Sequence, residues 1–366
     1  MLSYDVVEHG QPLQVRLRET PTPGPREVVI RISHSGLCHS DIHLWKGYFE
    51  LGPNRKQMLS DAGLRPPLTL GHEVLGTVIA VGADVDMDES AVGDTRLVFP
   101  WIGCGDCWAC DTGRSNLCAK PRNIGIALPG GFATHLVVPD AKYLVDVTGL
   151  DAGFAATLAC SGVTSYAAVG KLPPLHADDW VAVIGCGGVG MMAISILKAL
   201  GVVNVIAVDV DDSKLQAAQS LGAAQTLRAD SEGAAKALFK AAAGRLAGAI
   251  DFVGTPKTFG LGYSALRKGG TLVLCGLHGG EWTTPLPPLA QRSIAIVGSY
   301  VGTLDDLKAT VQLAKDGKLA PTPVRVRDAA EINEALDDLH RGRILGRTVL
   351  DFRGIDAAIE AGAQTS

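Results

Sequence analysis

One glycine-rich turn constrains the fold of this 366-residue chain more than any other feature. The sequence G-C-G-G-V-G, from Gly185 to Gly190, follows the apolar run 180–184 and precedes the helical pattern 189–200. This spacing lets Gly185 form a tight turn, lets Gly187 approach a pyrophosphate, and lets Gly190 pack a helix close to a sheet. The turn therefore predicts a strand–turn–helix unit that binds a dinucleotide at the N-terminus of the helix.

An acidic residue further along the chain indicates which dinucleotide binds. Asp209 ends the next apolar run, 19 residues after Gly190, where it can accept hydrogen bonds from ribose hydroxyls. Its charge would repel a 2′-phosphate, so NAD is favoured over NADP. The alternative is a structural turn followed by a solvent-facing carboxylate. The predicted cofactor contacts of this region are Gly185, Gly187, Gly188, Val189, Gly190, Asp209 and Lys214, which lies in the following helix.

The pattern of apolar and helix-forming residues changes near residue 150. Before it, β-branched runs punctuated by Pro and Gly predict a β-rich part with strands at 27–33, 73–81 and 132–138. From residue 179, apolar runs alternate with Ala-rich helical stretches, which predicts βαβ units around a doubly wound parallel sheet and hence an α/β protein. The expected strands are 180–184, 204–208, 249–253, 271–275, 294–297 and 347–352. The expected helices are 189–200, 213–221, 304–315 and 329–341. The last residues, 354–366, are expected to form a loosely held tail.

Charge and hydropathy narrow the function classes. The net charge of −5 argues against a protein that coats nucleic acid. With 47% hydrophobic and 19% charged residues, the composition is typical of a soluble globular protein, and the length predicts roughly two domains. No basic start precedes an apolar run, and no uncharged apolar run reaches about 18 residues. We expect a cytoplasmic protein without a membrane or nucleic-acid partner.

Four of the eight cysteines fall within 15 residues. Cys104, Cys107 and Cys110 have the spacing C-x2-C-x2-C, and Cys118 follows. Four thiolates on a short loop suit a closed tetrahedral site, for which zinc is the default ion, whereas an iron–sulfur cluster is the alternative. Because four protein ligands leave no open position, the predicted site is structural.

A second group of metal-binding side chains is spread over three segments. Two thiols and an imidazole among them would leave one tetrahedral position open, as a catalytic zinc site requires. Taken singly, each cysteine is more often a buried apolar residue. The candidates are Cys38, His39, Ser40, Asp41 and His43 in the first segment, His72 and Glu73 in the second, and Cys160 in the third.

These motifs together resemble the zinc-dependent medium-chain alcohol dehydrogenases, and the general texture is similar to bacterial and archaeal members. The resemblance runs from residue 28 to residue 352 and rests on G-L-C-H-S-D, G-H-E, the four-cysteine loop, A-C-S-G-V-T-S-Y, G-C-G-G-V-G and the late G-R pair. It implies a GroES-like β-rich catalytic domain and a Rossmann coenzyme domain. The implied limits are 1–161 and 301–366 for the catalytic part and 162–300 for the coenzyme part.

The resemblance also implies a role for each residue of the second zinc site. Cys38, His72 and Cys160 would be the catalytic zinc ligands. Glu73 would lie behind the ion, and Asp41 would orient the His72 ring. With the four-cysteine site, the family implies two zinc ions per chain and reversible hydride transfer between a primary, secondary or cyclic alcohol and NAD.

The remaining implied roles concern proton transfer, cofactor and substrate. Ser40 would lie beside the substrate oxygen, and His43 would end a proton relay to solvent. His39 and Arg347 would contact the cofactor phosphates. Trp101 and Tyr300 would line the substrate pocket. The family further implies a homo-oligomer, with a tetramer favoured over a dimer.

One segment departs from shorter relatives. The stretch 46–67, between two of the expected zinc ligands, is polar and turn-rich, and we expect it to overhang the cleft mouth or a subunit contact. Three other classes are alternatives. A zinc-free quinone reductase would lack the ligand set, and a polyol dehydrogenase would usually carry an acid in place of Cys160. The acidic net charge and the absence of aromatic-rich basic stretches argue against a non-enzymatic zinc-binding or nucleic-acid-binding module.

Overall fold

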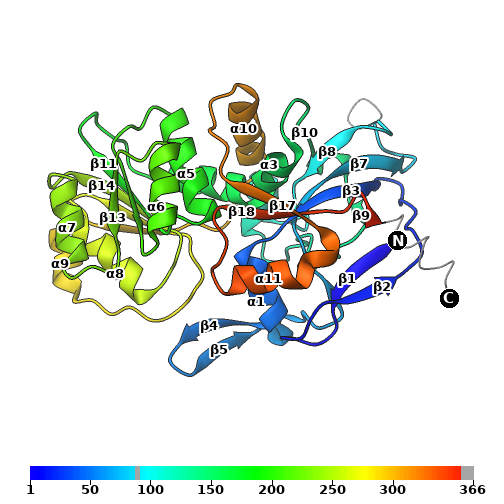
Figure 1. The fold of residues 1–366 in the computed structure, drawn as a ribbon, viewed down its shortest axis with the longest axis horizontal. Helices are drawn as coiled ribbons and strands as arrows, with labels where there is room; N and C mark the ends of the chain where they lie inside the picture. Colours follow the sequence, from blue (N-terminus) through cyan, green and yellow to red (C-terminus); the bar gives the residue numbers. More distant parts are fainter. Residues whose placement is uncertain (87–90, 356–366) are drawn as a thin grey trace.

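The structure is a computed structural model that describes residues 1–86 and 91–355. Figure 1 shows an elongated molecule with two parts side by side, and the first strand and the last described strand lie in the same part. From residue 356 onward, the expected tail lies outside the described residues.

Six parallel strands form the sheet of one part, in the order β13-β12-β11-β14-β15-β16. The strands are β11 (Trp180–Ile184), β12 (Val205–Asp209), β13 (Gln225–Arg228), β14 (Leu246–Asp251), β15 (Thr271–Leu274) and β16 (Ala295–Gly298). The helices that connect them are α5 (Gly188–Ala199), α6 (Asp212–Leu221), α7 (Ala234–Ala241), α8 (Pro256–Ala265) and α9 (Leu286–Gln291). This is the Rossmann arrangement that the sequence predicts.

Alternate residues of these strands belong to two different cores. Val181 and Val183 pack in the core that includes α5 and α6, whereas Ala182 and Ile184 pack in the core that includes α7 and α8. A strand buried on both faces needs a continuous apolar run, which explains the composition of 180–184. Figure 1 shows the two pairs of helices on opposite faces of the sheet.

The other part is built on a larger, mostly antiparallel sheet. Its order is β10-β8-β7-β3-β18-β17, and β9 also pairs with β3. The C-terminal strand β18 pairs with β3, so the chain returns to this part after the coenzyme sheet. The strands are β3 (Val28–Gly36), β7 (Glu73–Val81), β8 (Thr95–Val98), β9 (His135–Val138), β10 (Leu144–Asp146), β17 (Val324–Asp328) and β18 (Arg347–Asp351).

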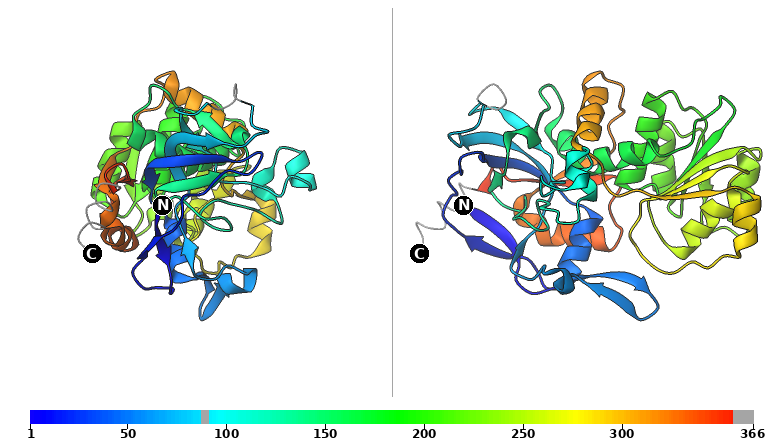
Figure 2. Two further views of the ribbon diagram at one scale, coloured as in Figure 1. Left: turned by 90° about the vertical axis from the view of Figure 1, so that its right-hand side faces the viewer. Right: turned by 180° about the vertical axis from the view of Figure 1, so that it is seen from behind.

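Smaller elements flank this sheet. A three-stranded sheet contains β1 (Leu2–Val6), β2 (Gln14–Leu17) and β6 (Leu68–Thr69). The expected overhanging stretch contains a hairpin of β4 (Tyr48–Gly52) and β5 (Arg55–Met58), which follows helix α1 (His39–Lys46). Figures 1 and 2 show the hairpin extending away from the larger antiparallel sheet and towards the coenzyme part. The short helix α2 (Trp108–Asp111) lies in the four-cysteine loop.

One helical run connects the two parts. It consists of α3 (Ala152–Thr157), a π-helical turn (Leu158–Gly162) and α4 (Val163–Val169). The run is long and apolar enough to span a membrane, but 78% of it is buried inside the protein, as in a core helix. Helix α10 (Leu304–Lys315) packs against α4 and the π-helical turn.

The predicted elements agree in type with those observed, and several boundaries differ. Residues 132–134 hydrogen-bond to the loop at Leu70 and to Leu2, so the regular strand β9 begins only at His135. The last expected helix begins later, as α11 (Ile332–His340), because the Asp328 side chain accepts the N–H of Ala330 and closes a 3-10 turn. Strand β13, helices α7 and α8, and the β4–β5 hairpin were not predicted.

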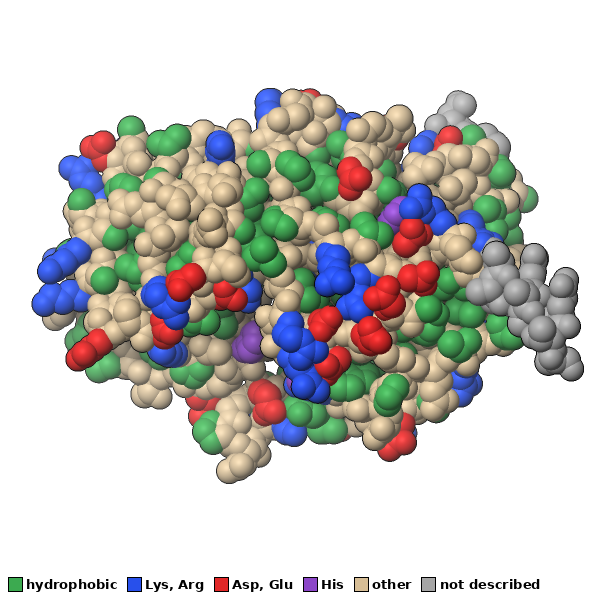
Figure 3. All heavy atoms as spheres, in the orientation of Figure 1, with side chains coloured by type: hydrophobic (Ala, Val, Ile, Leu, Met, Phe, Trp, Pro, Cys, Tyr) green, Lys and Arg blue, Asp and Glu red, His purple; other side chains and the backbone are tan. Residues whose placement is uncertain are grey.

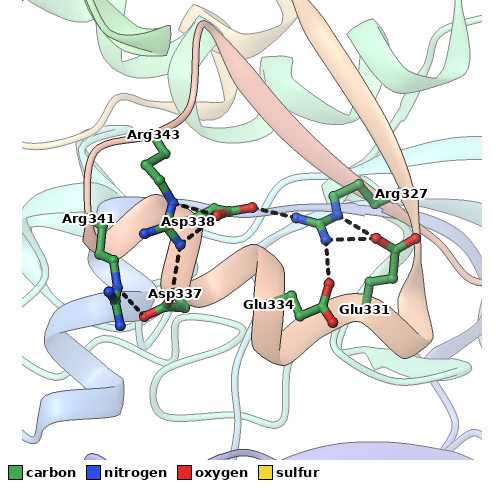
Figure 4. A network of polar contacts seen from close by, with 7 residues as sticks. All are labelled: Arg327, Glu331, Glu334, Asp337, Asp338, Arg341 and Arg343. Atoms are coloured by element: carbon green, nitrogen blue, oxygen red, sulfur yellow. Dashed lines mark hydrogen bonds and ion pairs between the residues drawn. The ribbon is translucent and has the colours of Figure 1, made fainter.

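An ion-pair network holds α11 against β17 (Figure 4). The Arg327 side chain, only 8% exposed, contacts the carboxylates of Glu331, Glu334 and Asp338. Figure 3 shows basic and acidic side chains gathered over this part of the surface. The remaining members of the network are Asp337, Arg341 and Arg343.

Candidate active site

Three segments bring the predicted catalytic zinc ligands together. Cys38 precedes α1, His72 precedes β7, and Cys160 lies in the π-helical turn. The Sγ atoms of Cys38 and Cys160 are 3.7 Å apart. One potential ligand atom from each of Cys38, His72, Glu73 and Cys160 lies within 4.8 Å of the others, and all four residues are buried. π-helical turns are frequent at functional sites, which agrees with the predicted role of Cys160 as a zinc ligand.

This geometry fits a zinc ion. Zinc–sulfur bonds of about 2.3 Å in a tetrahedral arrangement place two sulfurs about 3.8 Å apart. In addition, the buried Nε2 of His72 has no hydrogen-bond partner among the described residues. A buried, unpartnered ring nitrogen next to two thiols is costly unless a cation binds it. The donor set therefore suits zinc on chemistry as well as on distance.

The Asp41 carboxylate supports two of these ligands. Its Oδ1 lies 3.3 Å from Nδ1 of His72 and accepts the N–H of Gly71, whereas its Oδ2 accepts the N–H of Cys38 at 2.9 Å. Fixing one ring nitrogen of a histidine orients the other towards a metal. Asp41 is completely buried, so this orientation is held away from solvent.

The charges of the ligand groups also favour a cation. A hydrogen bond from Cys160 holds the pKa of Cys38 well below its usual range, and the neighbouring Cys38 thiolate holds the pKa of Cys160 well above it. Burial lowers the pKa of His72, but the Asp41 carboxylate and the Cys38 thiolate together raise it more, so the net shift is strongly upward. The pocket thus stabilises both a thiolate and a positive charge.

Glu73 and Arg347 form a buried ion pair behind the ligands. Burial raises the pKa of Glu73 to about 7, although Arg347 acts in the opposite direction. A Cβ at Gly36 would overlap the Glu73 carboxylate, so glycine is required there. The Arg347 side chain also packs on Gly188, where a Cβ would overlap it. Arg347 therefore joins the predicted zinc ligands to the glycine-rich turn, beside the place where the predicted cofactor would bind.

The glycine-rich turn offers space at one position. A Cβ on Gly190 would overlap the carbonyl of Gly185, and a Cβ on Gly185 would lie 2.6 Å from Val253, so both glycines serve packing. If Gly187 carried a Cβ atom, no other atom would lie within 4 Å of it. Gly187 is the N-cap residue of α5, so this open space lies directly at the start of the helix. This opening at a helix N-terminus suits a pyrophosphate.

Asp209 lies at the end of β12, beside the turn. Its carboxylate accepts the backbone N–H groups of Cys186, Val210 and Asp211 at 2.6–3.0 Å. The carboxylate is thereby fixed in place, and its remaining lone pairs can accept ribose hydroxyls. Val189 lies in the first turn of α5, and Lys214 lies in the first turn of α6.

The predicted relay residues lie on α1. Ser40 Oγ is 3.8 Å from Cys38 Sγ. The His43 ring stacks on Phe49 at 4.6 Å, and burial lowers the pKa of His43, as do the nearby His278 and Lys46. The His39 ring lies 5.7 Å from the His278 ring of the coenzyme part. The two imidazoles meet where the parts join.

The two predicted pocket aromatics differ in exposure. Trp101 is 1% exposed, its ring lies 5.2 Å from the His72 ring, and its Nε1 donates to the carbonyl of Ala159. Tyr300 is 44% exposed, with its ring 6.3 Å from that of Trp101. A cavity of about 570 Å³ is lined by Tyr300, whereas Trp101 is not among its lining residues.

The predicted structural cluster also assembles. Cys107 Sγ lies 3.6 Å from Cys110 Sγ and 3.7 Å from Cys118 Sγ, which again matches tetrahedral zinc. Backbone N–H groups donate to these sulfurs, among them that of Cys104 to Cys118 at 3.3 Å. Such donors lower the pKa of Cys118 to about 7, which favours the thiolate.

Apart from Tyr300, the side chains of the cavity wall are not among the residues predicted from the sequence. Phe49, Leu51 and Gln57 reach it from the β4–β5 hairpin, and Leu277 and Trp282 reach it from the segment after β15. The Gly-Pro-Asn turn at 52–54, flanked by short runs, is a hairpin signal that could have located the first three. The others depend on tertiary packing alone.

Two families match the two parts. Residues 24–149 match the alcohol dehydrogenase GroES-like domain, and residues 188–316 match the zinc-binding dehydrogenase family. An NAD-dependent alcohol dehydrogenase of Sulfurisphaera tokodaii is 36% identical over 354 residues, which cover 96% of this chain and 99% of that protein. The one of Saccharolobus solfataricus is 34% identical over 352 residues, which cover 96% and 99%.

Solved structures agree with these relatives. An alcohol dehydrogenase from Aeropyrum pernix has a TM-score of 0.86 at 30% identity, covering 96% of this chain and all of that one. An acetophenone reductase from Geotrichum candidum, solved with NAD, has a TM-score of 0.82 at 29% identity, covering 96% of both chains. Fold and site define a two-domain, zinc-binding oxidoreductase. The chain belongs to the zinc-dependent medium-chain alcohol dehydrogenase family.

Proposed function

We propose that this protein catalyses reversible hydride transfer between a primary, secondary or cyclic alcohol and NAD, which gives an aldehyde or ketone and NADH. The observation that carries the proposal is the buried cluster of Cys38, His72 and Cys160, joined through Arg347 to the glycine-rich turn. Such a cluster leaves one metal position open to substrate beside a dinucleotide site.

Cys38, His72 and Cys160 would hold the catalytic zinc, and Cys104, Cys107, Cys110 and Cys118 a structural one. When bound, zinc supplies Lewis-acid polarisation of the alcohol oxygen, and NAD supplies the hydride acceptor. Gly187 and the N-terminus of α5 would bind the pyrophosphate, and Asp209 the adenosine ribose.

The chain's own residues would orient the substrate and move its proton. Ser40, beside Cys38, is placed to accept the hydroxyl proton. His43 is half-buried with a lowered pKa, so its imidazole is neutral at pH 7 and can take up a proton. Asp41 holds the His72 ring in orientation. Trp101, packed on that ring, excludes water from one side of the cluster.

We also propose the domain limits 1–161, 162–300 and 301–366. The pairing of β18 with β3 supports the return to the catalytic part, and the first limit lies within the helical run Ala152–Val169. A cytoplasmic homo-oligomer, with a tetramer favoured, is the proposed form. The edge strand β16 with exposed Ile296, and the exposed Leu286 of α9, support self-association. Light scattering of the purified protein tests the subunit number.

An activity screen tests the proposed function. The purified protein is given primary, secondary and cyclic alcohols and a polyol, each with NAD and with NADP, and NADH formation is followed by absorbance. Oxidation of simple alcohols with NAD is expected. Preference for the polyol would favour the polyol dehydrogenase class, and zinc binding without any NAD reduction would favour a non-enzymatic module.

A further inference from the structure

The cavity of about 570 Å³ has walls from both parts of the molecule. The β4–β5 hairpin contributes one wall, and the segments that follow β14 and β15 contribute the other. Figures 1 and 2 show the hairpin lying against the long loop of the coenzyme part, in both the front and the rear view. A volume of this size accommodates a small organic molecule.

Two ring contacts connect the wall of the cavity with residues of the proposed active site. Phe49 lines the cavity and stacks at 4.6 Å on His43, the proposed end of the proton path. Tyr300 lines it from the opposite part and lies 6.3 Å from Trp101, which packs on the ligand His72. One ring, that of Phe49, therefore separates the cavity from His43, and the rings of Tyr300 and Trp101 separate it from His72.

The lining of the cavity is mostly apolar. Leu51 and Leu277 line it from opposite walls and are 39% and 45% exposed. Among the described lining residues, Glu50 alone is charged, and its carboxylate lies 4.0 Å from Lys56 Nζ. Exposed apolar side chains that converge on one cavity indicate a binding site for an apolar group.

The hairpin wall is fixed to the coenzyme part by direct contacts. Arg55 forms an ion pair with Glu281 at 2.6 Å. A Cβ on Gly52 would lie 2.9 Å from the Glu281 side chain, and a Cβ on Gly279 would overlap the carbonyl of Glu50. The absence of a side chain at both glycines lets the two walls meet closely, so the hairpin has a defined position over the cavity.

We propose that the β4–β5 hairpin is a specificity-determining element that binds the apolar substituent of the substrate alcohol, with Leu51 as its main contact. This inference rests on the proposed function and names the substrate class: alcohols that carry a bulky alkyl or aryl group. Phe49 and Leu277 complete the apolar surface, and the pair Arg55–Glu281 positions the hairpin.

A comparison of three alcohols tests the role of Leu51. The kcat/KM values for 1-phenylethanol, cyclohexanol and ethanol with NAD are measured for the wild type, Leu51→Ala and Met58→Ala. Met58 is a matched control, because it lies on the same hairpin and is exposed but does not line the cavity. Leu51→Ala should lower the ratio of 1-phenylethanol to ethanol roughly tenfold, whereas Met58→Ala should leave it unchanged.

Exchanging the charges of Arg55 and Glu281 tests independently whether this ion pair positions the hairpin. Arg55→Glu should lower the same ratio, because it places two carboxylates together, and Arg55→Glu combined with Glu281→Arg should restore it. Equal ratios in the wild type, Leu51→Ala and Arg55→Glu would overturn the inference while leaving the proposed function intact. A raised KM for NAD in Leu51→Ala at an unchanged ratio would assign the cavity to the cofactor and also overturn it. A wild type that oxidises none of the three alcohols would overturn the proposed function itself.

Discussion

The Asp41 carboxylate lies 3.3 Å from Nδ1 of His72, and both side chains are completely buried. The same carboxylate accepts the N–H of Cys38, so one side chain positions two of the three proposed ligands. These contacts hold the Asp41 side chain in one position, because a buried polar group is stable only when it is paired. The carboxylate is therefore expected to govern metal affinity without touching the metal.

Asp41→Asn should weaken zinc binding at the catalytic site about 10- to 100-fold, because the amide keeps the shape but removes the charge that orients the His72 ring. Zinc loss to a chelator, followed over time, measures this affinity. Zinc in the four-cysteine loop is the internal control and should be retained. A variant that loses both zinc fractions at the wild-type rates would contradict the role given to Asp41.

His43→Gln should lower kcat for alcohol oxidation at neutral pH roughly a hundredfold, because glutamine cannot accept the proton. Burial lowers the pKa of His43 below its usual value, with His278 and Lys46 adding to the effect. A neutral imidazole exists only above its pKa, so the acid decline of the wild-type rate should lie at lower pH than an ordinary histidine, with a pKa of about 6.5, would place it. The pH profile of kcat measures both effects.

His176→Gln is the matched control for His43→Gln, because His176 lies on an exposed loop before β11. It should reproduce the wild-type profile. An unchanged acid limb and rate in His43→Gln would remove His43 from the proton path.

Two alanine variants separate binding from packing in the glycine-rich turn. Gly187→Ala should raise the KM for NAD about tenfold with little change in Tm, because its Cβ would enter the open space before α5. Gly190→Ala should lower Tm by several degrees, because its Cβ would overlap the carbonyl of Gly185 and overpacking costs about 1–3 kcal/mol. Thermal unfolding and NAD kinetics on both proteins check this, and the opposite pattern would refute the assignment.

The network of Figure 4 predicts a difference between two arginines on the same surface. Arg327→Met should reduce the free energy of unfolding by about 2 kcal/mol, because three carboxylates lose a nearly buried cation. Arg341→Met should change it by less than about 0.5 kcal/mol, because Arg341 is 64% exposed. Urea unfolding measures both values, and equal values would contradict the stabilising role of the network.

The centre of the coenzyme part was predictable because its signals are local. The glycine-rich turn, the apolar runs and Asp209 each follow from chain spacing, whereas the less apolar strand β13 and helices α7 and α8 were not predicted. The four-cysteine cluster is local in the same way. In contrast, Cys38, His72 and Cys160 are far apart in the chain, and only the resemblance to a family joined them before the fold was known.

Other relationships between residues could not be predicted from the sequence, because they depend on how distant segments pack in three dimensions. The pairing of Arg347 with Glu73 depends on β18 returning beside β3, a contact between residues 274 positions apart. The wall formed by Leu51 depends on where the hairpin meets the coenzyme part. Neither relationship leaves a periodic or spacing signal in the sequence.

The central claim is that Cys38, His72 and Cys160 hold a catalytic zinc separate from the four-cysteine site. The most direct measurement is the zinc content of the wild type and of Cys38→Ala, together with NAD binding and NADH formation from an alcohol. Two zinc ions per wild-type chain and one in Cys38→Ala are expected, with NAD binding kept and NADH formation lost. A Cys38→Ala protein with the wild-type zinc content and the wild-type rate would contradict it.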